Sequence, residues 1–213
     1  MKPLQDCRLY TFVDTAYLRG RDPADLARQL CEGGCDVVQL RAKKESRDEV
    51  RRLAESILPV TRAANVAFVL NDYPEIAQQV GAECVHLGQE DFFDTGLTQR
   101  DQLTSLDAGI KLGLSSHAPE QAQRAVAAGA DYIAIGPVFA TGTKPGRAPV
   151  TTEYVRWAAS NVSVPWFAIG GITLGNLDAI LSAGATRICV VSAILNAPDP
   201  AKACREFKRA LCS

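Results

Sequence analysis

The sequence contains side chains that are suited to holding a metal ion together with a polyphosphate. Asp72, which follows Asn71, and Asp91 offer hard oxygen ligands, and such ligands suit Mg²⁺ better than zinc. The cations that could neutralise a polyphosphate are Arg41, Lys43 and Lys144. We therefore expect a magnesium-linked anion site that uses both kinds of charge.

A second anion site is indicated by backbone groups rather than by side chains. Gly170 and Gly171 follow one strand-like apolar run, and Val191 and Ser192 follow the next. Bare amides and helix starts after late strands commonly bind phosphate. Gly171 would be needed at this position because a side chain there would block the approach of the anion.

Structural explanations compete with these functional ones. Asp72 follows a strand and could cap a helix, whereas Asp91 lies further from any expected helix. His86 lies within an apolar run and is interpreted as a hydrogen-bonded core histidine, while His117 fits a helix cap as well as a site residue. Taken alone, Lys144 would be a solvated loop lysine.

A short repeated pattern suggests how these residues are positioned. Each copy has a glycine, a small residue, a polar residue and then an apolar run, as expected for a helix that ends at a left-handed glycine before a buried strand. The copies are Gly34–Leu40, Gly81–Leu87, Gly129–Ile135 and Gly184–Val190.

With the remaining apolar runs, the pattern predicts eight strands alternating with helices. The strands begin near Leu9, Asp36, Val66, Glu83, Lys111, Tyr132, Pro165 and Arg187. The helical stretches are Asp22–Gly33, Ser46–Ala64, Glu75–Val80, Thr98–Leu106, Pro119–Ala128, Thr151–Val162, Leu174–Ala183 and Asp199–Leu211. The longest stretches without periodicity are Gln89–Gly96 and Thr141–Pro149.

This alternation predicts an α/β protein with a single (β/α)₈ TIM-barrel domain over residues 1–213. An open doubly wound sheet is the alternative, but it would need a glycine-rich turn after the first strand, and residues 13–17 contain no glycine. In a barrel the candidate polar residues all fall at the carboxyl ends of strands, where chemistry is located.

Composition excludes several classes of function. Hydrophobic residues make up 47% and charged residues 22%, which is typical of a globular protein. The formal charge of −1 argues against a general nucleic-acid binder or a polybasic membrane clamp. We find neither a bilayer-spanning apolar run nor a signal-peptide core at the start. The seven cysteines have no CxxC spacing, so we expect reduced thiols in a cytoplasmic protein.

With these residues in place, the chain resembles the thiamine phosphate synthase family. The matching segments follow the family's order along nearly the whole chain. They are Gln39–Lys43, Asn71–Asp72, Val85–Asp91, Gly113–His117, Gly136–Lys144, Ala168–Ile172 and Val190–Ile194.

The resemblance implies a Mg²⁺-dependent transferase of thiamine biosynthesis that joins a hydroxymethylpyrimidine diphosphate to a thiazole phosphate and releases pyrophosphate. It implies that Asp72 and Asp91 bind Mg²⁺ and that Gln39 contacts the aminopyrimidine ring. The diphosphate would be held by Arg41, Lys43, Asn71, Lys144 and Ser115, of which all but Asn71 are also expected to act in catalysis. The thiazole phosphate would be bound by Thr141, Thr143, Gly171, Val191 and Ser192.

Two departures and several alternatives accompany this interpretation. Ala42 stands where the family usually has Glu, and Trp166 is bulkier than expected. The alternatives are a thiazole tautomerase-type barrel, which would need a general base such as histidine, another phosphate-binding isomerase or aldolase barrel, and a non-catalytic protein that binds thiamine precursors. The expected partners are small molecules only, and the sequence leaves open whether the chain forms a homo-oligomer.

Overall fold

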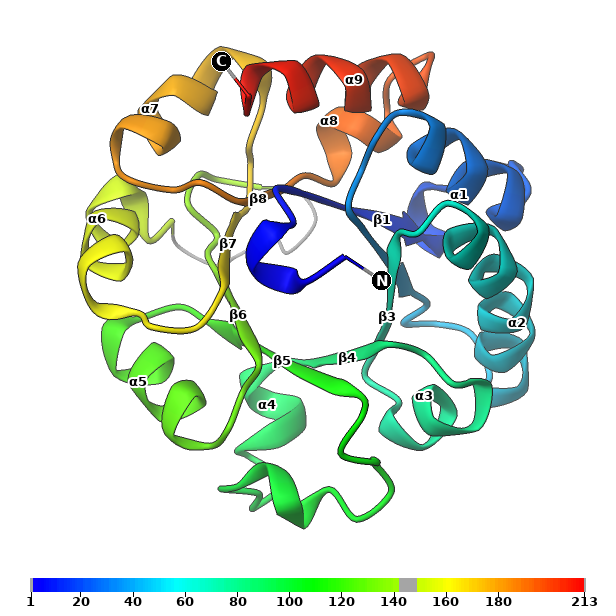
Figure 1. Ribbon diagram of the computed structural model, residues 1–213, viewed down its shortest axis with the longest axis horizontal. Helices are drawn as coiled ribbons and strands as arrows, with labels where there is room; N and C mark the ends of the chain where they lie inside the picture. The colour runs from blue at the N-terminus through cyan, green and yellow to red at the C-terminus, as the bar shows by residue number, and fades with distance from the viewer. Residues whose placement is uncertain (1, 142–148, 213) are drawn as a thin grey trace.

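The computed structural model describes residues 2–141 and 149–212. Eight parallel strands close into a barrel in chain order, which confirms the predicted (β/α)₈ fold (Figure 1). They are β1 (Leu9–Asp14), β2 (Val37–Arg41), β3 (Ala67–Asn71), β4 (Cys84–Leu87), β5 (Lys111–Ser116), β6 (Tyr132–Ile135), β7 (Trp166–Ile169) and β8 (Ile188–Cys189). Pairing of Leu9 with Ile188 joins β1 to β8 and completes the ring.

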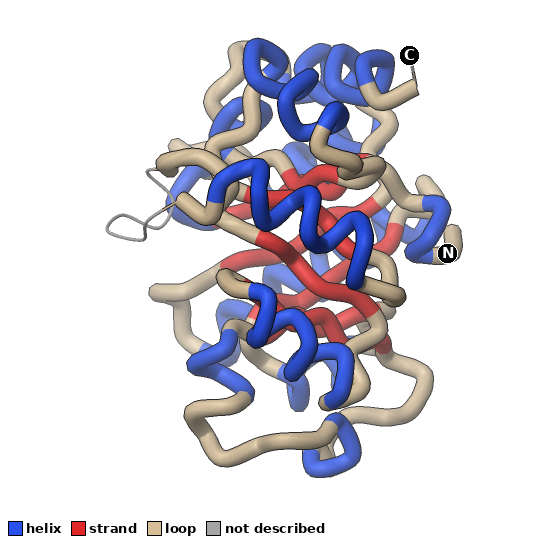
Figure 2. The backbone as a smooth tube through the Cα atoms, turned by 90° about the vertical axis from the view of Figure 1, so that its left-hand side faces the viewer, coloured by secondary structure: helices blue, strands red, loops and turns tan. Residues whose placement is uncertain are grey.

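Helices surround the strands, which cross the middle of the molecule at a tilt (Figure 2). The helices are α1 (Pro23–Glu32), α2 (Arg47–Ala63), α3 (Pro74–Val80), α4 (Gln89–Phe92), α5 (Pro119–Ala127), α6 (Thr151–Asn161), α7 (Leu177–Ser182), α8 (Ser192–Leu195) and α9 (Pro200–Ala210). Short 3₁₀ turns are η1 (Leu4–Asp6), η2 (Thr15–Tyr17), η3 (Arg100–Gln102) and η4 (Leu174–Asn176). Every one of these helices in the described chain is too short or too polar to cross a lipid bilayer.

Helix starts follow local chemistry that the sequence makes visible. Proline occupies the first turn of α1, α3, α5 and α9, where its missing N–H costs nothing. Asp22 and Asp199 cap α1 and α9 by accepting hydrogen bonds from backbone N–H groups of their first turns.

The repeated pattern has a structural role at the amino-terminal end of the barrel. The carboxylate of Asp36 accepts from the backbone N–H of Leu9, that of Glu83 from Phe68, and that of Asp131 from Leu112. In each case the polar residue before one strand binds the start of the preceding strand. The fourth copy differs because Arg187 donates to the Gln5 carbonyl instead.

Two local expectations were wrong. The stretch Thr98–Leu106 forms only the 3₁₀ turn η3, because Arg100 donates to the carbonyls of Ala108 and Ile110 and pairs with Asp131. These bonds hold the segment in an irregular path. Conversely, the stretch Gln89–Gly96, which has no periodicity, begins with the short helix α4.

Candidate active site

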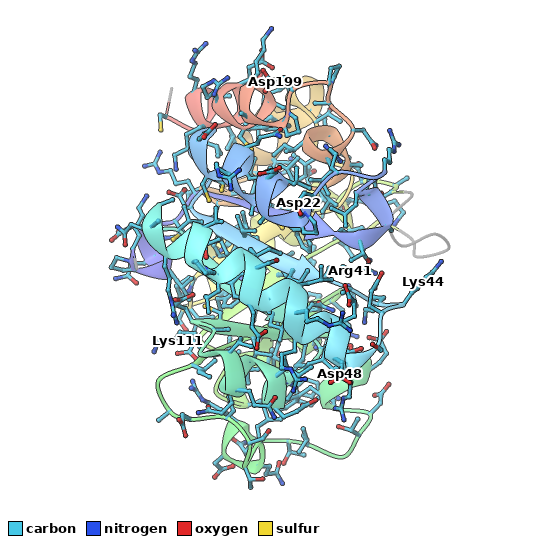
Figure 3. All side chains as sticks on the ribbon, turned by 90° about the vertical axis from the view of Figure 1, so that its right-hand side faces the viewer. Asp22, Arg41, Lys44, Asp48, Lys111 and Asp199 are labelled. Carbon is cyan, nitrogen blue, oxygen red and sulfur yellow. The ribbon has the colours of Figure 1, made fainter. Side chains whose placement is uncertain are left out.

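One cavity at the carboxyl ends of the strands collects residues from all eight of them and from the following loops. Figure 3 shows Arg41, which ends β2, and Lys44 at one end of the barrel, and Lys111, which begins β5, at the other. The predicted site residues that line the cavity are Gln39, Arg41, Lys43, Asn71, Asp72, Asp91, Ser115, Thr141, Gly171, Val191 and Ser192. Thr143 and Lys144 lie outside the described residues.

Asp72 and Asp91 meet at the rim of this cavity. The ammonium group of Lys43 forms an ion pair with the Asp72 carboxylate and lies 3.8 Å from that of Asp91. Burial raises the pKa of Asp72, Lys43 opposes this shift, and the neighbouring Asp91 carboxylate adds to it. The two carboxylates therefore lie close enough together for both to contact the same ammonium group.

The backbone around the two acids answers the question of helix capping that the sequence left open for Asp72, and it corrects the expectation for Asp91. Asp72 caps no helix, because the residue before α3 is Tyr73. The positive φ of Asp72, 71°, directs the chain out of β3. Asp91 was expected to lie away from any helix, but it lies in the first turn of α4. Its carboxylate accepts a hydrogen bond from Gly88 N–H at 3.2 Å, so it also acts as a cap.

The donor set suits Mg²⁺. Two carboxylates next to the Asn71 amide are hard oxygen donors, and Mg²⁺ commonly takes one or two carboxylates and completes its shell with water and substrate phosphates. No cluster of three or more His, Cys, Asp or Glu side chains that could hold a metal occurs in residues 2–141 and 149–212. A metal ion at Asp72 and Asp91 would therefore complete its shell with water or with oxygens of a bound ligand.

Arg41 is held by a carboxylate that the sequence analysis did not select. Its guanidinium donates to Asp14 at 2.9 Å, and the other oxygen of Asp14 accepts from Ala16 N–H at 3.0 Å. Asp14 is 1% exposed and is the register partner of Arg41 on β1. Alternation along β1 was the available signal, because Tyr10, Phe12 and Asp14 share one face of the strand.

Gly171 is required for a different reason from the expected one. Its φ is +65°, and a Cβ there would lie 2.6 Å from the Ala140 carbonyl oxygen and 2.8 Å from the Phe139 Cβ. The chain after β6 packs directly against this position, so a side chain would displace protein backbone before it met a ligand. Val191 and Ser192 lead from β8 into α8 and line the same part of the cavity wall.

The two histidines occupy different places. His86 is buried and hydrogen-bonded, as expected, yet it also lines the cavity, with its ring nitrogens 3.2 Å from the Tyr132 hydroxyl and 3.0 Å from the Ser115 hydroxyl. His117 lines the cavity as well, and its ring nitrogen Nδ1 bonds the Gly136 carbonyl. Sequence analysis missed Tyr10 and Tyr132, whose hydroxyl groups join this network.

Comparisons with known proteins show which family and fold this chain is similar to. The family described as thiamine monophosphate synthase matches residues 9–194. A thiamine-phosphate synthase of Thermus thermophilus is 49% identical, with 88% of both chains covered. That of Halalkalibacterium halodurans is 36% identical, with 98% of this chain and 97% of the relative covered. The solved thiamine phosphate pyrophosphorylase from Pyrococcus furiosus superposes with a TM-score of 0.84 at 28% identity, over 98% of this chain and 96% of that one.

Proposed function

The chain belongs to the thiamine monophosphate synthase family, and from this premise we propose how its cavity carries out the family's reaction. The activity is that of a transferase that forms thiamine phosphate from a hydroxymethylpyrimidine diphosphate and a thiazole phosphate. The observation that carries the assignment of roles is the meeting of Asp72 and Asp91 at Lys43, on the rim of a cavity that also holds Arg41.

The reaction needs charge neutralisation and positioning rather than proton transfer. The bond between the pyrimidine methylene carbon and the diphosphate oxygen breaks, and pyrophosphate leaves with the electron pair. The lone pair of the thiazole nitrogen then forms the new carbon–nitrogen bond, which leaves a thiazolium cation. Bound Mg²⁺ would supply Lewis-acid neutralisation of the diphosphate. Arg41 and Lys43 would bind the departing oxygens, and alignment of the two substrates supplies several kcal/mol of the barrier reduction.

The same assignment gives a place to each substrate. Gln39 and Ser115 are buried in the cavity, at 2% and 9% exposure, where the pyrimidine ring would be shielded from water that could trap the developing cation. We therefore assign Ser115 to the pyrimidine ring rather than to the diphosphate, where the family resemblance had placed it. Thr141, Gly171 and Ser192 line the wall that we assign to the thiazole phosphate.

All seven cysteines lie among the described residues and are free thiols, which supports a reducing compartment such as the cytoplasm.

The tautomerase alternative requires a histidine that takes a proton from the substrate. His86 is poorly placed for this, because both of its ring nitrogens face hydroxyl groups of the protein, so the alternative would depend on His117, the other histidine that lines the cavity.

Turnover with an Asp91 variant tests the proposed metal site. The two phosphorylated precursors are mixed with and without Mg²⁺, and thiamine phosphate is measured. We expect Asp91→Ala to abolish Mg²⁺-dependent turnover and to leave the circular dichroism spectrum unchanged. Asp91→Asn retains an acceptor for the Gly88 N–H, so a loss of Mg²⁺-dependent turnover in both variants would assign the effect to the negative charge of Asp91.

Asp94→Ala is the matched control, because Asp94 is an exposed acid just beyond the same short helix and does not line the cavity. Unchanged activity in Asp91→Ala would remove Asp91 from the metal site. Absence of product from the unaltered chain would instead support the non-catalytic alternative.

A further inference from the structure

Five buried side chains form a hydrogen-bonded path across the barrel interior below the mouth. Gln39 Nε2 donates to the Tyr10 hydroxyl at 2.6 Å, and the two hydroxyls of Tyr10 and Tyr132 are 3.2 Å apart. The Tyr132 hydroxyl lies 3.2 Å from Nδ1 of His86, and Nε2 of His86 lies 3.0 Å from Oγ of Ser115. The path therefore runs from β2 through β1, β6 and β4 to β5, and its links from β1 to β6 and from β6 to β4 join strands that are not neighbours.

One arrangement of the protons lets every donor of the path find an acceptor within it. In this arrangement Gln39 donates to Tyr10, the single proton of Tyr10 is directed to Tyr132, and that of Tyr132 to Nδ1 of His86. A neutral imidazole that accepts at Nδ1 carries its proton at Nε2 and donates it to Ser115. Burial raises the pKa of both phenols well above the ordinary value, so each remains a donor.

The two ends of the path consequently present different groups to a ligand, an acceptor at Gln39 and a donor at Ser115. Because Gln39 uses its amide nitrogen on Tyr10, its carbonyl oxygen is left as an acceptor. Because Ser115 accepts from His86, its own proton is left as a donor. A 4-aminopyrimidine carries an amino donor beside a ring nitrogen acceptor, which complements this pattern. A 4-oxopyrimidine carries a carbonyl acceptor beside a ring N–H donor, which opposes it.

The interior is shaped to hold Tyr132 in place. Gly113 on β5 is the register partner of Tyr132, and a Cβ at Gly113 would overlap the Tyr132 ring. The ring also packs edge-on against Phe167, with centroids 5.9 Å apart. Gly113 belongs to one of the segments that the family resemblance rests on, and room for this ring accounts for a glycine at that position.

We propose that Tyr10 and Tyr132 are specificity-determining positioning residues, which orient Gln39 and Ser115 so that the site accepts a 4-aminopyrimidine diphosphate and rejects its 4-oxo counterpart. This inference rests on the proposed function, because it assumes that the pyrimidine binds at this depth of the cavity. The tyrosines act through Gln39, His86 and Ser115 and need not touch the substrate.

Measuring which ring nitrogen of His86 carries the proton tests the hydrogen-bonded path without requiring enzymatic activity. The chain has 2 histidines, so ¹⁵N-histidine labelling gives a simple NMR spectrum, and the variant His117→Gln assigns its signals. We expect neutral His86 to carry its proton on Nε2, and Tyr132→Phe, which removes the donor to Nδ1, to weaken that preference. A proton on Nδ1 in the unaltered chain would reverse the path and overturn the inference.

Substrate discrimination tests the consequence. The measured quantity is the ratio of kcat/KM for the 4-amino and 4-oxo pyrimidine diphosphates, with Mg²⁺ and thiazole phosphate saturating. We expect the amino compound to be favoured by roughly 10⁴-fold, as for sites whose buried polar groups would be left unpaired. Tyr10→Phe and Tyr132→Phe should each lower the ratio at least tenfold, with little change in KM for the thiazole phosphate.

Tyr154→Phe is the matched control. Its hydroxyl is also buried and bonds Ser116 and the Ala118 carbonyl, but it lies on α6, away from the cavity. The assignment would be overturned if the ratio of the two kcat/KM values were unchanged in Tyr132→Phe. It would also be overturned if that ratio fell by the same factor in Tyr154→Phe. Failure of the proposed function is distinguishable, because it would abolish product formation in the unaltered chain while the NMR result stood.

Discussion

Asp14 shows how a buried residue can orient a cation of the candidate site without lining the cavity itself. The sequence identified Arg41 as a cation at the mouth, but the apolar run Leu9–Val13 gave no reason to select the acid that follows it. The pairing becomes visible only when β1 and β2 are placed in register, with Asp14 opposite Arg41. A side chain on one strand thus fixes the direction of a guanidinium on its neighbour.

The variant Asp14→Asn tests this positioning role. Loss of the charged partner removes a charge-assisted hydrogen bond that contributes about 1.5–3 kcal/mol. We expect kcat/KM for the pyrimidine diphosphate to fall roughly 10- to 100-fold, and KM for the thiazole phosphate to change little. Steady-state kinetics with each substrate varied in turn checks both values.

Asp25→Asn provides the comparison, because Asp25 forms an exposed ion pair with Arg28 on α1 and should be kinetically silent. Equal effects on the two substrates would indicate a general structural defect in Asp14→Asn and would contradict the positioning role.

At the scale of elements, the repeated pattern could be seen in the sequence but its purpose could not. The glycines and apolar runs predicted where helices end and strands begin, and the structure confirms those positions. The polar residue had no assigned role, because in three of the four copies its partner is a backbone N–H of the preceding strand, 15 to 27 residues earlier in the chain. The irregular segment around η3 was mispredicted for the same reason, since Arg100 there is held by Asp131, far along the sequence.

Asp36 gives a prediction about stability and pH. Burial opposes its ionisation, but hydrogen bonds from Lys2, Lys208 and the backbone N–H groups of Leu9 and Arg8 outweigh burial and lower its pKa. Asp36→Asn should reduce the free energy of unfolding by about 1–3 kcal/mol at pH 7. Chemical denaturation of both proteins measures the difference.

The pH dependence of that difference has a defined sign. A lowered pKa in the folded state means that the ionised carboxylate stabilises the fold above its unfolded pKa of about 3.9, and that this contribution is lost as the pH falls through the folded pKa. The gap between the two proteins should therefore be complete at pH 7 and shrink below about pH 4. A gap that stays constant through this acidic range would exclude the charge as its cause.

At the scale of the whole molecule, the sequence predicted which end of the barrel gathers the candidate site residues, because polar residues recur at the carboxyl ends of strands, and the structure has a cavity there. It could not predict which side chains meet across the barrel. Tyr10 and Tyr132 are 122 residues apart, and their contact depends on the closure of the ring and on the space that Gly113 leaves. The alternation of polar and apolar residues specifies the face of a strand, whereas contacts between opposite strands follow from barrel geometry.

The shared rim of the cavity predicts that Mg²⁺ and pyrophosphate stabilise the fold cooperatively. The carboxylates of Asp72 and Asp91 repel an incoming anion unless a cation lies between them, so each ligand should strengthen binding of the other. One ligand near 100 times its dissociation constant stabilises the fold by about 2.7 kcal/mol, or a rise in Tm of roughly 5–10 °C, and the two ligands together should exceed the sum of their separate effects. Thermal unfolding with Mg²⁺ alone, pyrophosphate alone and both together measures this. Asp91→Ala should lose the part that requires Mg²⁺, and Asp94→Ala should retain it; a pyrophosphate effect of equal size without Mg²⁺ would contradict the shared site.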